Sequence, residues 1–359
     1  MTSAISPVPS AADRLVALIA EAGGAIRFDR FMSECLYGGA GFYTSRGGRA
    51  GRRGDFITSP EIGPLFGAVI ARALDAWWSE MGRPENFSVI EVGAGPGSLA
   101  RSVLAARPEC LDGRPGAYVA VEVSDHQRSQ HPEPVTSTDH VPVGPITGVV
   151  FANELLDNLP FRLLVGDGRW REAWVTERDG KFLEVLREID PATSAIGDVN
   201  VSEAAPLGAR IPWQESASTW VKGIVSRLHG RLVVVDYMVA ATSELARRPW
   251  REWLRTYAGH EKGSHYLLRP GEQDITGDVC VDQLRSALDP PDSMRTQAHF
   301  LQHWGIDELV EEGKRIWAEK AARPDLEAVK MRSRVSESEA LTDPGGLGGF
   351  TVVEFRGSL

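Results

Sequence analysis

The most constraining feature of the sequence is a glycine-rich turn that follows a short apolar run. Residues 88–92 are typical of a buried strand, and Gly93, Gly95 and Gly97 follow it directly, before an apolar helical segment at residues 98–106. Glycines let the backbone turn sharply and approach a ligand that any Cβ would push away. The helix that follows presents unpaired N–H groups at its first turn. The pattern therefore predicts a ligand-binding turn between a strand and a helix.

The spacing of these glycines distinguishes between kinds of nucleotide site. A dinucleotide fingerprint has glycines at relative positions 1, 3 and 6, but here Ser98 occupies the sixth position and Gly97 the fifth. The turn also lacks the Lys-Ser/Thr pair of a P-loop. A G-x-G-x-G turn just after an acid, here Glu91, is the form used for S-adenosylmethionine. We therefore expect S-adenosylmethionine as the cofactor, bound by Glu91 and the three glycines.

A second acid supports this interpretation. Glu122 lies at the end of the next predicted strand (residues 117–123), 25 residues after Gly97. A carboxylate at that place can accept both ribose hydroxyls, as the distal acid of dinucleotide sites does. The alternative is that the turn merely connects a strand to a helix. The position of Glu122 at the end of the next strand argues against this alternative.

The rest of the chain predicts a fold of the α/β class. Short apolar runs at residues 148–152 and 231–236 continue the strand–helix alternation and indicate a parallel, Rossmann-like sheet with helices on both faces. A strand at residues 349–355 is expected at an antiparallel edge. Residues 1–86 are expected to form an N-terminal helical extension with a Gly/Arg-rich loop, residues 87–160 the cofactor-binding half, residues 161–225 an inserted β-rich flap, and residues 226–359 the second half with an acceptor-side loop. Within the extension, a helix is expected from Ser59 as N-cap to about Met81.

Carboxylates follow the strand at residues 148–152. Asn153 and Glu154 come directly after it, where open α/β sheets bind ligands, and Asp157 follows three residues later. Two carboxylates would suit an arginine, because a guanidinium is always charged and matches a carboxylate bidentately. We predict Asn153, Glu154 and Asp157 as the catalytic residues. The alternative is that Asp157 caps the local turn and that Glu154 is solvated.

Composition limits the remaining classes. The 359 residues are 42% hydrophobic and 25% charged, as in an ordinary globular protein, and the net charge of −10 argues against a duplex nucleic-acid binder. Three scattered cysteines form no CxxC pair, and His260 and His265 lack clustered partners, so no metal is expected. Residues 1–12 lack a basic leader and the run at 15–20 is too short for a membrane span, so the sequence predicts a cytoplasmic protein.

Several longer motifs carry a family resemblance. They are Gly41-Phe42-Tyr43, Gly54-Asp55-Phe56-Ile57-Thr58-Ser59-Pro60-Glu61, the glycine turn with Glu122, Asn153-Glu154 with Asp157, Tyr257 with His260, and Gly271-Glu272-Gln273-Asp274-Ile275-Thr276. From about Phe31 to Phe355 the chain resembles the MidA family of S-adenosylmethionine-dependent methyltransferases, which includes a mitochondrial assembly factor that methylates an arginine on a respiratory complex I subunit. The resemblance implies a class I methyltransferase core. It also implies a cofactor contact by Gly54, Asp55, Phe56 and Thr58, and an acceptor side lined by Tyr257, His260, Asp274 and Thr276.

The resemblance implies methylation of arginine on a protein partner. Departures from the family pattern, such as Phe42 in place of a tyrosine and Gly38-Gly39 in place of Asp-Pro, lie outside the cofactor motifs and bear on the acceptor. Two alternatives therefore stay open: a small-molecule methyltransferase with the same cofactor site, and a non-catalytic cofactor-binding assembly factor. The sequence leaves open the acceptor, the number of methyl groups, a homodimer, and whether the Arg46–Arg53 loop binds a partner.

Overall fold

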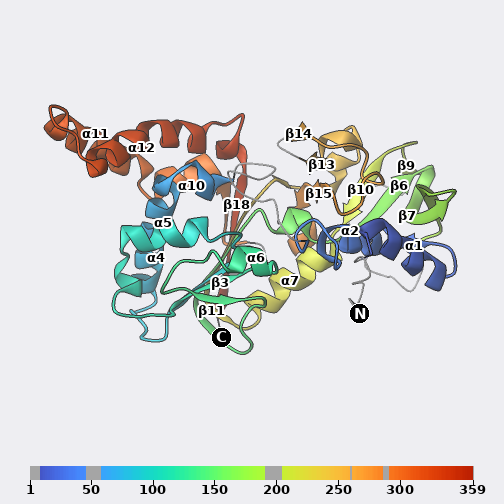
Figure 1. Ribbon diagram of the computed structural model, residues 1–359, viewed down its shortest axis with the longest axis horizontal. Helices are drawn as coiled ribbons and strands as arrows, with labels where there is room; N and C mark the ends of the chain where they lie inside the picture. The colour runs from blue at the N-terminus through green and yellow to red at the C-terminus, as the bar shows by residue number, and fades with distance from the viewer. Residues whose placement is uncertain (1–8, 46–57, 191–203, 259–260, 286–290, 359) are drawn as a thin grey trace, which may run out of the picture. The chain divides into compact units, whose positions relative to one another are not determined.

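The computed structural model describes residues 9–45, 58–190, 204–258, 261–285 and 291–358 (Figure 1). The chain forms two compact units, each built from three stretches. Unit 1 comprises Met1–Arg49, Leu156–Lys222 and Met238–Asp289, and unit 2 comprises Ala50–Leu155, Gly223–Tyr237 and Pro290–Leu359. The division into four segments at residues 86, 160 and 225 remains a prediction.

Unit 2 is built on a seven-stranded, mostly parallel sheet. Its strand order is β17-β18-β11-β5-β2-β3-β4, in which β11, β5, β2, β3 and β4 run parallel and β18 and β17 are antiparallel. The strands are β2 (Ser88–Val92), β3 (Tyr118–Val121), β4 (Thr136–Thr138), β5 (Ile146–Asn153), β11 (Leu228–Asp236), β17 (Ser293–Thr296) and β18 (Thr351–Ser358). The mixed α/β fold with a central, mostly parallel sheet is thus confirmed. The strand predicted at residues 88–92 is β2, and its observed bounds are the same.

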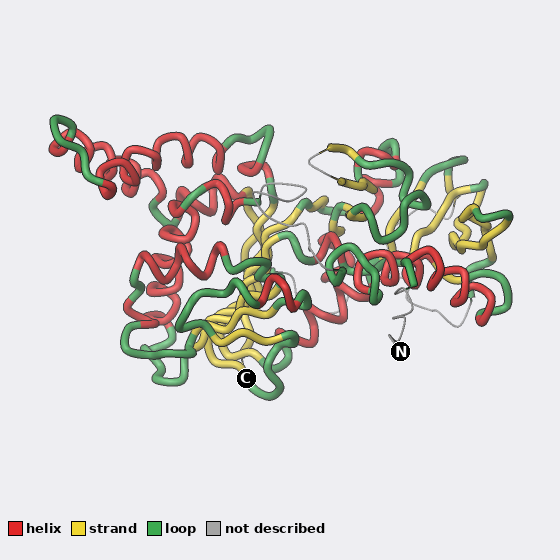
Figure 2. The backbone as a smooth tube through the Cα atoms, viewed as in Figure 1, coloured by secondary structure: helices red, strands yellow, loops and turns green. Residues whose placement is uncertain are grey.

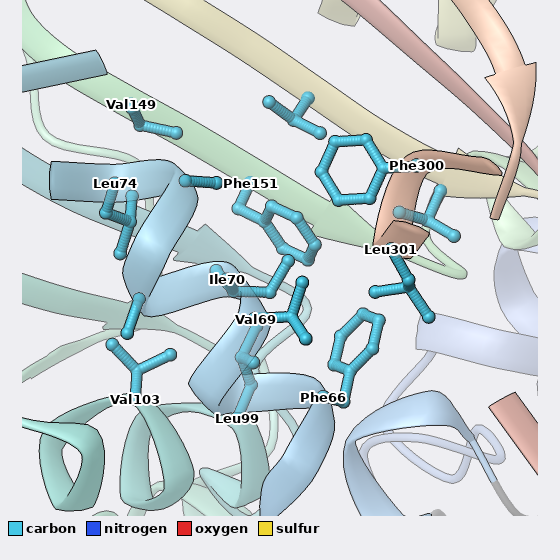
Figure 3. Packing of buried hydrophobic residues seen from close by; sticks show 14 of the residues in the cluster. Phe66, Val69, Ile70, Leu74, Leu99, Val103, Val149, Phe151, Phe300 and Leu301 are labelled. Carbon is cyan, nitrogen blue, oxygen red and sulfur yellow. The ribbon is translucent and has the colours of Figure 1, made fainter. Parts of the chain in front are cut away.

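Helices cover one face of this sheet. Side chains of α4 (Pro64–Glu80), α5 (Ser98–Ala106) and α10 (Gln297–His303) point toward β5 and interlock, as Figure 3 shows for Phe66, Ile70, Leu99, Phe151 and Phe300. The alternate residues of the same strands, such as Ile90, Val150 and Val234, face the other side and are also buried. Near-continuous apolar strands of this kind are expected where a parallel sheet is covered on both faces.

The remaining helices of unit 2 are short, apart from one pair. The short helices are α3 (Ser59–Ile62), α6 (Asp125–Arg128), η1 (Glu109–Leu111) and η5 (Leu347–Gly349). The long pair, α11 (Ile306–Lys320) and α12 (Leu326–Thr342), packs together as a hairpin that extends from the sheet (Figures 1 and 2). None of the described helices combines the length and the apolar character needed to cross a bilayer.

Two sequence-based expectations about unit 2 need correction. The predicted helix from Ser59 to about Met81 is interrupted at Gly63, because Pro64 opens a new helix and disfavours helical geometry in the residue before it. The N-cap of the first piece is Thr58, one residue earlier than expected. The C-terminal strand is antiparallel, as predicted, but it is not the edge strand, since β17 pairs with its outer side.

Unit 1 contains a larger antiparallel sheet and two small ones. In the larger sheet, the path β1-β7-β6-β10 is joined by β8 and β9, both paired with β7. Its strands are β1 (Ile26–Arg27), β6 (Arg162–Gly166), β7 (Gly168–Arg178), β8 (Lys181–Arg187), β9 (Ala204–Ala205) and β10 (Arg210–Trp213). Five of these strands, β6 to β10, lie within residues 161–225, the segment predicted to be rich in strands.

The small sheets and the helices complete unit 1. The order β14-β13-β15 forms a three-stranded sheet, and β12 pairs with β16. These strands are β12 (Met238–Val239), β13 (Leu254–Ala258), β14 (Glu261–Lys262), β15 (Asp274–Gly277) and β16 (Val279–Cys280). The helices are α1 (Ala11–Glu21), α2 (Phe28–Tyr37), η2 (Leu156–Asn158), α8 (Thr242–Leu245), η4 (Trp250–Glu252) and α9 (Val281–Arg285), together with α7 (Glu215–Val225), which spans the unit boundary at Lys222.

Candidate active site

The glycine turn has a backbone that only glycine adopts easily. The φ angles of Gly93, Gly95 and Gly97 are 75°, 53° and 80°, all in the left-handed region. A Cβ on Gly97 would lie 3.1 Å from Cδ of Pro132 and 3.2 Å from Cδ2 of His131. Gly97 is also the N-cap of α5, so the turn leads into a helix N-terminus. This geometry suits a cofactor held against bare backbone.

Glu122 lies beside this turn, directly after β3. Its Oε2 accepts a hydrogen bond from the Gly95 N–H at 3.0 Å, and its Oε1 accepts one from the Ser124 N–H at 2.9 Å. Burial raises the pKa of the Glu122 carboxyl, while the two backbone donors oppose that rise. The acid and the glycine turn, predicted from spacing, are therefore brought into direct contact.

The Glu91 carboxyl lies on β2 inside unit 2. Its Oε2 accepts a hydrogen bond from the Tyr118 hydroxyl at 2.7 Å, and only 5% of the residue is exposed. Burial raises the pKa of Glu91 to about 8. Its observed partner is therefore the hydroxyl of the neighbouring strand, and its contact with the cofactor stays a prediction.

Asn153 and Glu154 form a pair at the carboxyl end of β5. The Asn153 Nδ2 donates to Glu154 Oε1 at 3.0 Å, and Glu154 has a left-handed φ of 51°, which is uncommon for a residue with a side chain. Its backbone N–H donates to Val235 O at 2.8 Å, which fixes this conformation. Strained backbone of this kind is concentrated at functional sites.

The pair is next to the glycine turn in unit 2. Strands β2 and β5 are parallel neighbours, and Val92 is paired with Ala152. Gly93 and Asn153 are the next residues of the two segments, so they are neighbours at the carboxyl ends of the strands. A Cβ on Gly93 would lie 3.2 Å from Cδ1 of Leu155. The predicted cofactor turn and two of the three predicted catalytic residues therefore share one edge of the sheet.

The third predicted catalytic residue, Asp157, lies in η2 of unit 1. Its Oδ2 accepts a hydrogen bond from the hydroxyl of Thr276 on β15. Burial raises the pKa of Asp157 to about 6, against the lowering effects of Thr276 and Arg255. Asp157 and Thr276, predicted as a catalytic and an acceptor-side residue, are thus direct partners.

A second buried carboxyl, Asp274, is the centre of a polar network in unit 1. Its Oδ1 lies 3.0 Å from the Tyr43 hydroxyl and accepts from Asn158 Nδ2 at 3.0 Å, while the Tyr43 hydroxyl also lies 3.1 Å from Asn158 Oδ1. Burial, followed by the charge of Asp157, raises the pKa of Asp274 to about 7. The sequence did not single out Asn158, although it lies next to Asp157.

Strand register brings the acceptor-side residues onto one face of the β14-β13-β15 sheet. Tyr257 is opposite Asp274, and Arg255 is opposite Thr276. Because alternate residues of a strand share a face, these four side chains lie on the same side of the sheet. Three of the four predicted acceptor-side residues, Tyr257, Asp274 and Thr276, are therefore grouped.

The remaining predicted site residues have no described contact with these groups. The Thr58 N–H donates to Glu61 Oε2 at 3.2 Å, so the described role of Thr58 is to cap α3. Gly54, Asp55, Phe56 and His260 lie outside the described residues, as does the Arg46–Arg53 loop. Within the described ranges, no cluster of three or more His, Cys, Asp or Glu residues could hold a metal ion.

Comparison with known proteins identifies the family. The family model described as "Putative S-adenosyl-L-methionine-dependent methyltransferase" matches residues 69–299. A Drosophila melanogaster relative, "Protein arginine methyltransferase NDUFAF7 homolog, mitochondrial", is 32% identical across 90% of this chain and 80% of its own length. The chain belongs to this methyltransferase family. The resemblance to the MidA family is thus confirmed, and S-adenosylmethionine is the cofactor.

A further relative and a solved structure support the same family. The Xenopus tropicalis protein arginine methyltransferase NDUFAF7 is 24% identical across 79% of this chain and 73% of its own length. A crystal structure of a "likely methyl transferase from Burkholderia thailandensis bound to S-adenosyl-homocysteine" superposes with a TM-score of 0.79 at 26% identity, over 98% of this chain and 95% of that chain. The structural similarity therefore extends through both units.

One expectation from the sequence is wrong. The cytoplasmic location was predicted from the absence of a basic leader, but the relatives from fly and frog are named as mitochondrial proteins. The first twelve residues are a poor guide, because location is set by short segments that the fold does not need.

Proposed function

We propose that this methyltransferase transfers a methyl group to an arginine side chain of a protein partner. The observation that carries the proposal is the Asn153–Glu154 pair beside the glycine turn, with Glu154 in a left-handed conformation. The protein arginine methyltransferases among its relatives support the choice of acceptor.

The donor side is assigned to the glycine turn and Glu122. The three left-handed glycines place no Cβ over the turn, and their own N–H groups are engaged by Val121 O, Glu122 Oε2 and Ala94 O. The Glu122 carboxylate beside Gly95 provides acceptors for ribose hydroxyls. Gly54, Asp55, Phe56 and Thr58 are proposed to complete the donor side, together with Glu91 as a further cofactor-binding residue.

The acceptor side is assigned first to Asn153 and Glu154. S-adenosylmethionine supplies an electrophilic methyl group, and its transfer to a guanidinium nitrogen forms an N–C bond, breaks the S–C bond and releases one proton. The Glu154 carboxylate would pair with the guanidinium and fix its orientation, because this cation keeps its charge at any physiological pH. The Asn153 Nδ2 holds Glu154 Oε1, which leaves the Asn153 Oδ1 as the amide acceptor for an N–H of the substrate.

Unit 1 is proposed to contribute a second acidic group. Asp157, held by Thr276, and Asp274, held by Tyr43 and Asn158, are the carboxyls of this group, and Tyr257 and His260 are proposed to border it. We further propose that residues 1–86 act as an N-terminal helical extension and residues 161–225 as an inserted β-rich flap.

The test is methyl transfer from labelled S-adenosylmethionine to a fractionated protein extract. We expect label on protein, recovered as methylarginine after hydrolysis and mass spectrometry. The Glu154→Gln variant should lose about 100-fold or more in turnover, since a misplaced or uncharged partner no longer fixes the guanidinium. Glu339→Gln, at an exposed position on α12, is the matched control and should be unchanged.

Other outcomes select the alternatives. Label found only on low-mass metabolites would assign the same site to a small-molecule acceptor. If Glu154→Gln binds S-adenosylhomocysteine normally and leaves the cellular phenotype unaltered, the role is that of a non-catalytic cofactor-binding assembly factor.

A further inference from the structure

A small pocket in unit 1 has no part in the proposed reaction. It has a volume of about 180 Å³ and lies around η4, β13 and the segment after β14. Ligand cavities for whole cofactors or drug-sized molecules are larger, roughly 300–1,000 Å³. The pocket therefore suits a single small group, such as one side-chain terminus or one small ion.

The pocket is positively charged. Three cationic residues line it, Arg251, Arg255 and Lys262, and none of the ten lining residues is acidic. Arg255 is paired with Asp278 at 2.8 Å, but neither Arg251 nor Lys262 forms an ion pair with any carboxylate of the described ranges. On a chain with a net charge of −10, two uncompensated cations at one pocket form a local field that favours an anion.

A histidine adds a neutral donor to the pocket wall. The Leu267 N–H donates to His265 Nδ1 at 3.2 Å, so the ring proton of the neutral imidazole resides on Nε2. Burial, followed by the charges of Arg210 and Arg251, lowers the pKa of His265, which keeps the ring neutral at pH 7. Its Nε2–H has no acceptor among the residues that the structure describes, and His265 is one of the residues that line the pocket.

Gly263, one of the lining residues, is closely packed. A Cβ on Gly263 would lie 2.6 Å from Thr256 Oγ1 and 2.8 Å from Gln273 Oε1, so only glycine fits there. Gln273 Oε1 also accepts from the Ser264 N–H at 3.1 Å. The Arg251 guanidinium is held 4.5 Å from the centre of the Trp250 ring, which orders an otherwise flexible side chain. Arg251 and Lys262 are both exposed, and the stacked Arg251 is the donor with the smaller entropic cost of binding.

We propose that this pocket binds a small oxyanion, a carboxylate or a phosphate, through Arg251, Lys262 and the Nε2–H of His265. The oxyanion is either an acidic side chain of the protein substrate or a free anion. The first source rests on the proposed function, whereas anion binding itself does not, because no residue that lines the pocket is assigned to the cofactor or the guanidinium. Charge-assisted hydrogen bonds from an arginine and a lysine are the strongest contacts available for such a group.

The experiment is a titration of the full chain, without methyl donor, followed by the NMR signal of the His265 ring. The signal is assigned with His265→Gln. Inorganic phosphate and capped glutamate (N-acetyl-glutamate N-methylamide) are the two probes, with capped glutamine as the neutral analogue and ionic strength held constant. We expect a saturable shift with at least one anionic probe and none with capped glutamine.

Variants separate a site from a general charge effect. The R251A/K262A double variant should weaken binding about tenfold or more, and R251K/K262R should retain it. The control is K314A/R315A on α11, which removes the same two charges from exposed positions and should leave the dissociation constant unchanged.

The outcomes also identify the source of the oxyanion. Binding of capped glutamate indicates a side chain of the substrate, and binding of phosphate alone indicates a free anion. Absence of a saturable shift with both probes, or equal weakening in the pocket and control variants, would overturn the proposal. Neither result depends on methyl transfer, so a failure here is distinguishable from a failure of the proposed function.

Discussion

The carboxylate of Glu122 accepts a hydrogen bond from the backbone N–H of Gly95 at 3.0 Å, which joins the ends of two adjacent parallel strands. The same carboxylate accepts from the Ser124 N–H, so both of its oxygens are oriented. An acid held this way can bind ribose hydroxyls without first losing side-chain freedom. This relationship supports the proposal that the glycine turn and Glu122 form the donor site.

Removing the Glu122 carboxylate should weaken cofactor binding. We expect Glu122→Ala to bind S-adenosylhomocysteine roughly 10–100-fold more weakly, because hydrogen bonds to a charged group contribute about 1.5–3 kcal/mol and each tenfold corresponds to about 1.4 kcal/mol. Isothermal titration calorimetry measures the effect, with Glu339→Ala as the exposed control. An unchanged affinity would exclude Glu122 from the cofactor site.

The backbone of the turn should tolerate no side chain. Gly97→Ala places a Cβ at a φ of 80° and close to Pro132 and His131, so we expect a loss of about 1–2 kcal/mol in stability together with weaker cofactor binding. The control is Gly223→Ala in α7, where a Cβ would meet nothing within 4 Å. That substitution should stabilise the chain by about 0.5–1 kcal/mol. Urea denaturation of both variants measures these opposite changes in stability. If Gly97→Ala is as stable as the unmodified chain, the turn does not require a glycine.

The glycine turn could be predicted from sequence because its information is local. Strand, turn and helix are consecutive, and the glycine spacing is readable without knowing any tertiary contact. The break at Gly63 is local as well, since Pro64 disfavours helical geometry in the residue before it, and attention to that rule would have found it.

The acidic network of unit 1 could not be predicted in the same way, because its residues are far apart in the sequence. Tyr43 and Asp274 are 231 positions apart, and their contact depends on the pairing of β13 with β15 and on the placement of η2. The register of non-local strands is not encoded in any short window, so Asn158 could not be identified as the residue that joins the two. The edge strand β17 was missed for a related reason: Ser293–Thr296 is short and polar, without an apolar pattern to reveal it.

The buried carboxyl of Asp274 should make stability depend on pH. Its pKa is raised from 3.8 in an unfolded chain to about 7 in the fold, so between these values the folded chain binds a proton that the unfolded chain does not. The free energy of unfolding should therefore decrease as pH rises from about 4 to 7, by at most about 1.4 kcal/mol per pH unit for this proton.

Asp274→Asn tests this expectation. The variant should be less sensitive to pH than the unmodified chain in urea denaturation between pH 5 and pH 8, since its side chain carries no titratable proton. Asp112→Asn, at an exposed position, is the control and should leave the slope unaltered. Identical slopes in Asp274→Asn and the unmodified chain would show that Asp274 does not titrate in this range.

The hydroxyl of Thr276 should lower the pH of the acid limb of kcat/KM. This hydroxyl donates to Asp157 and lowers the pKa of that carboxyl, but burial outweighs this effect, so the pKa is raised to about 6 with the hydrogen bond in place. If Asp157 must be ionised to attract the guanidinium, the acid limb of kcat/KM follows this pKa. Thr276→Val removes the donor at nearly constant volume, so the limb should move to higher pH by about one unit, the equivalent of a hydrogen bond of about 1.4 kcal/mol. Activity should fall more at pH 6.5 than at pH 8.5, and Thr276→Ser should restore the original profile. A uniform loss at all pH values would instead mean that Thr276 only supports packing and that the ionisation of Asp157 does not limit the reaction.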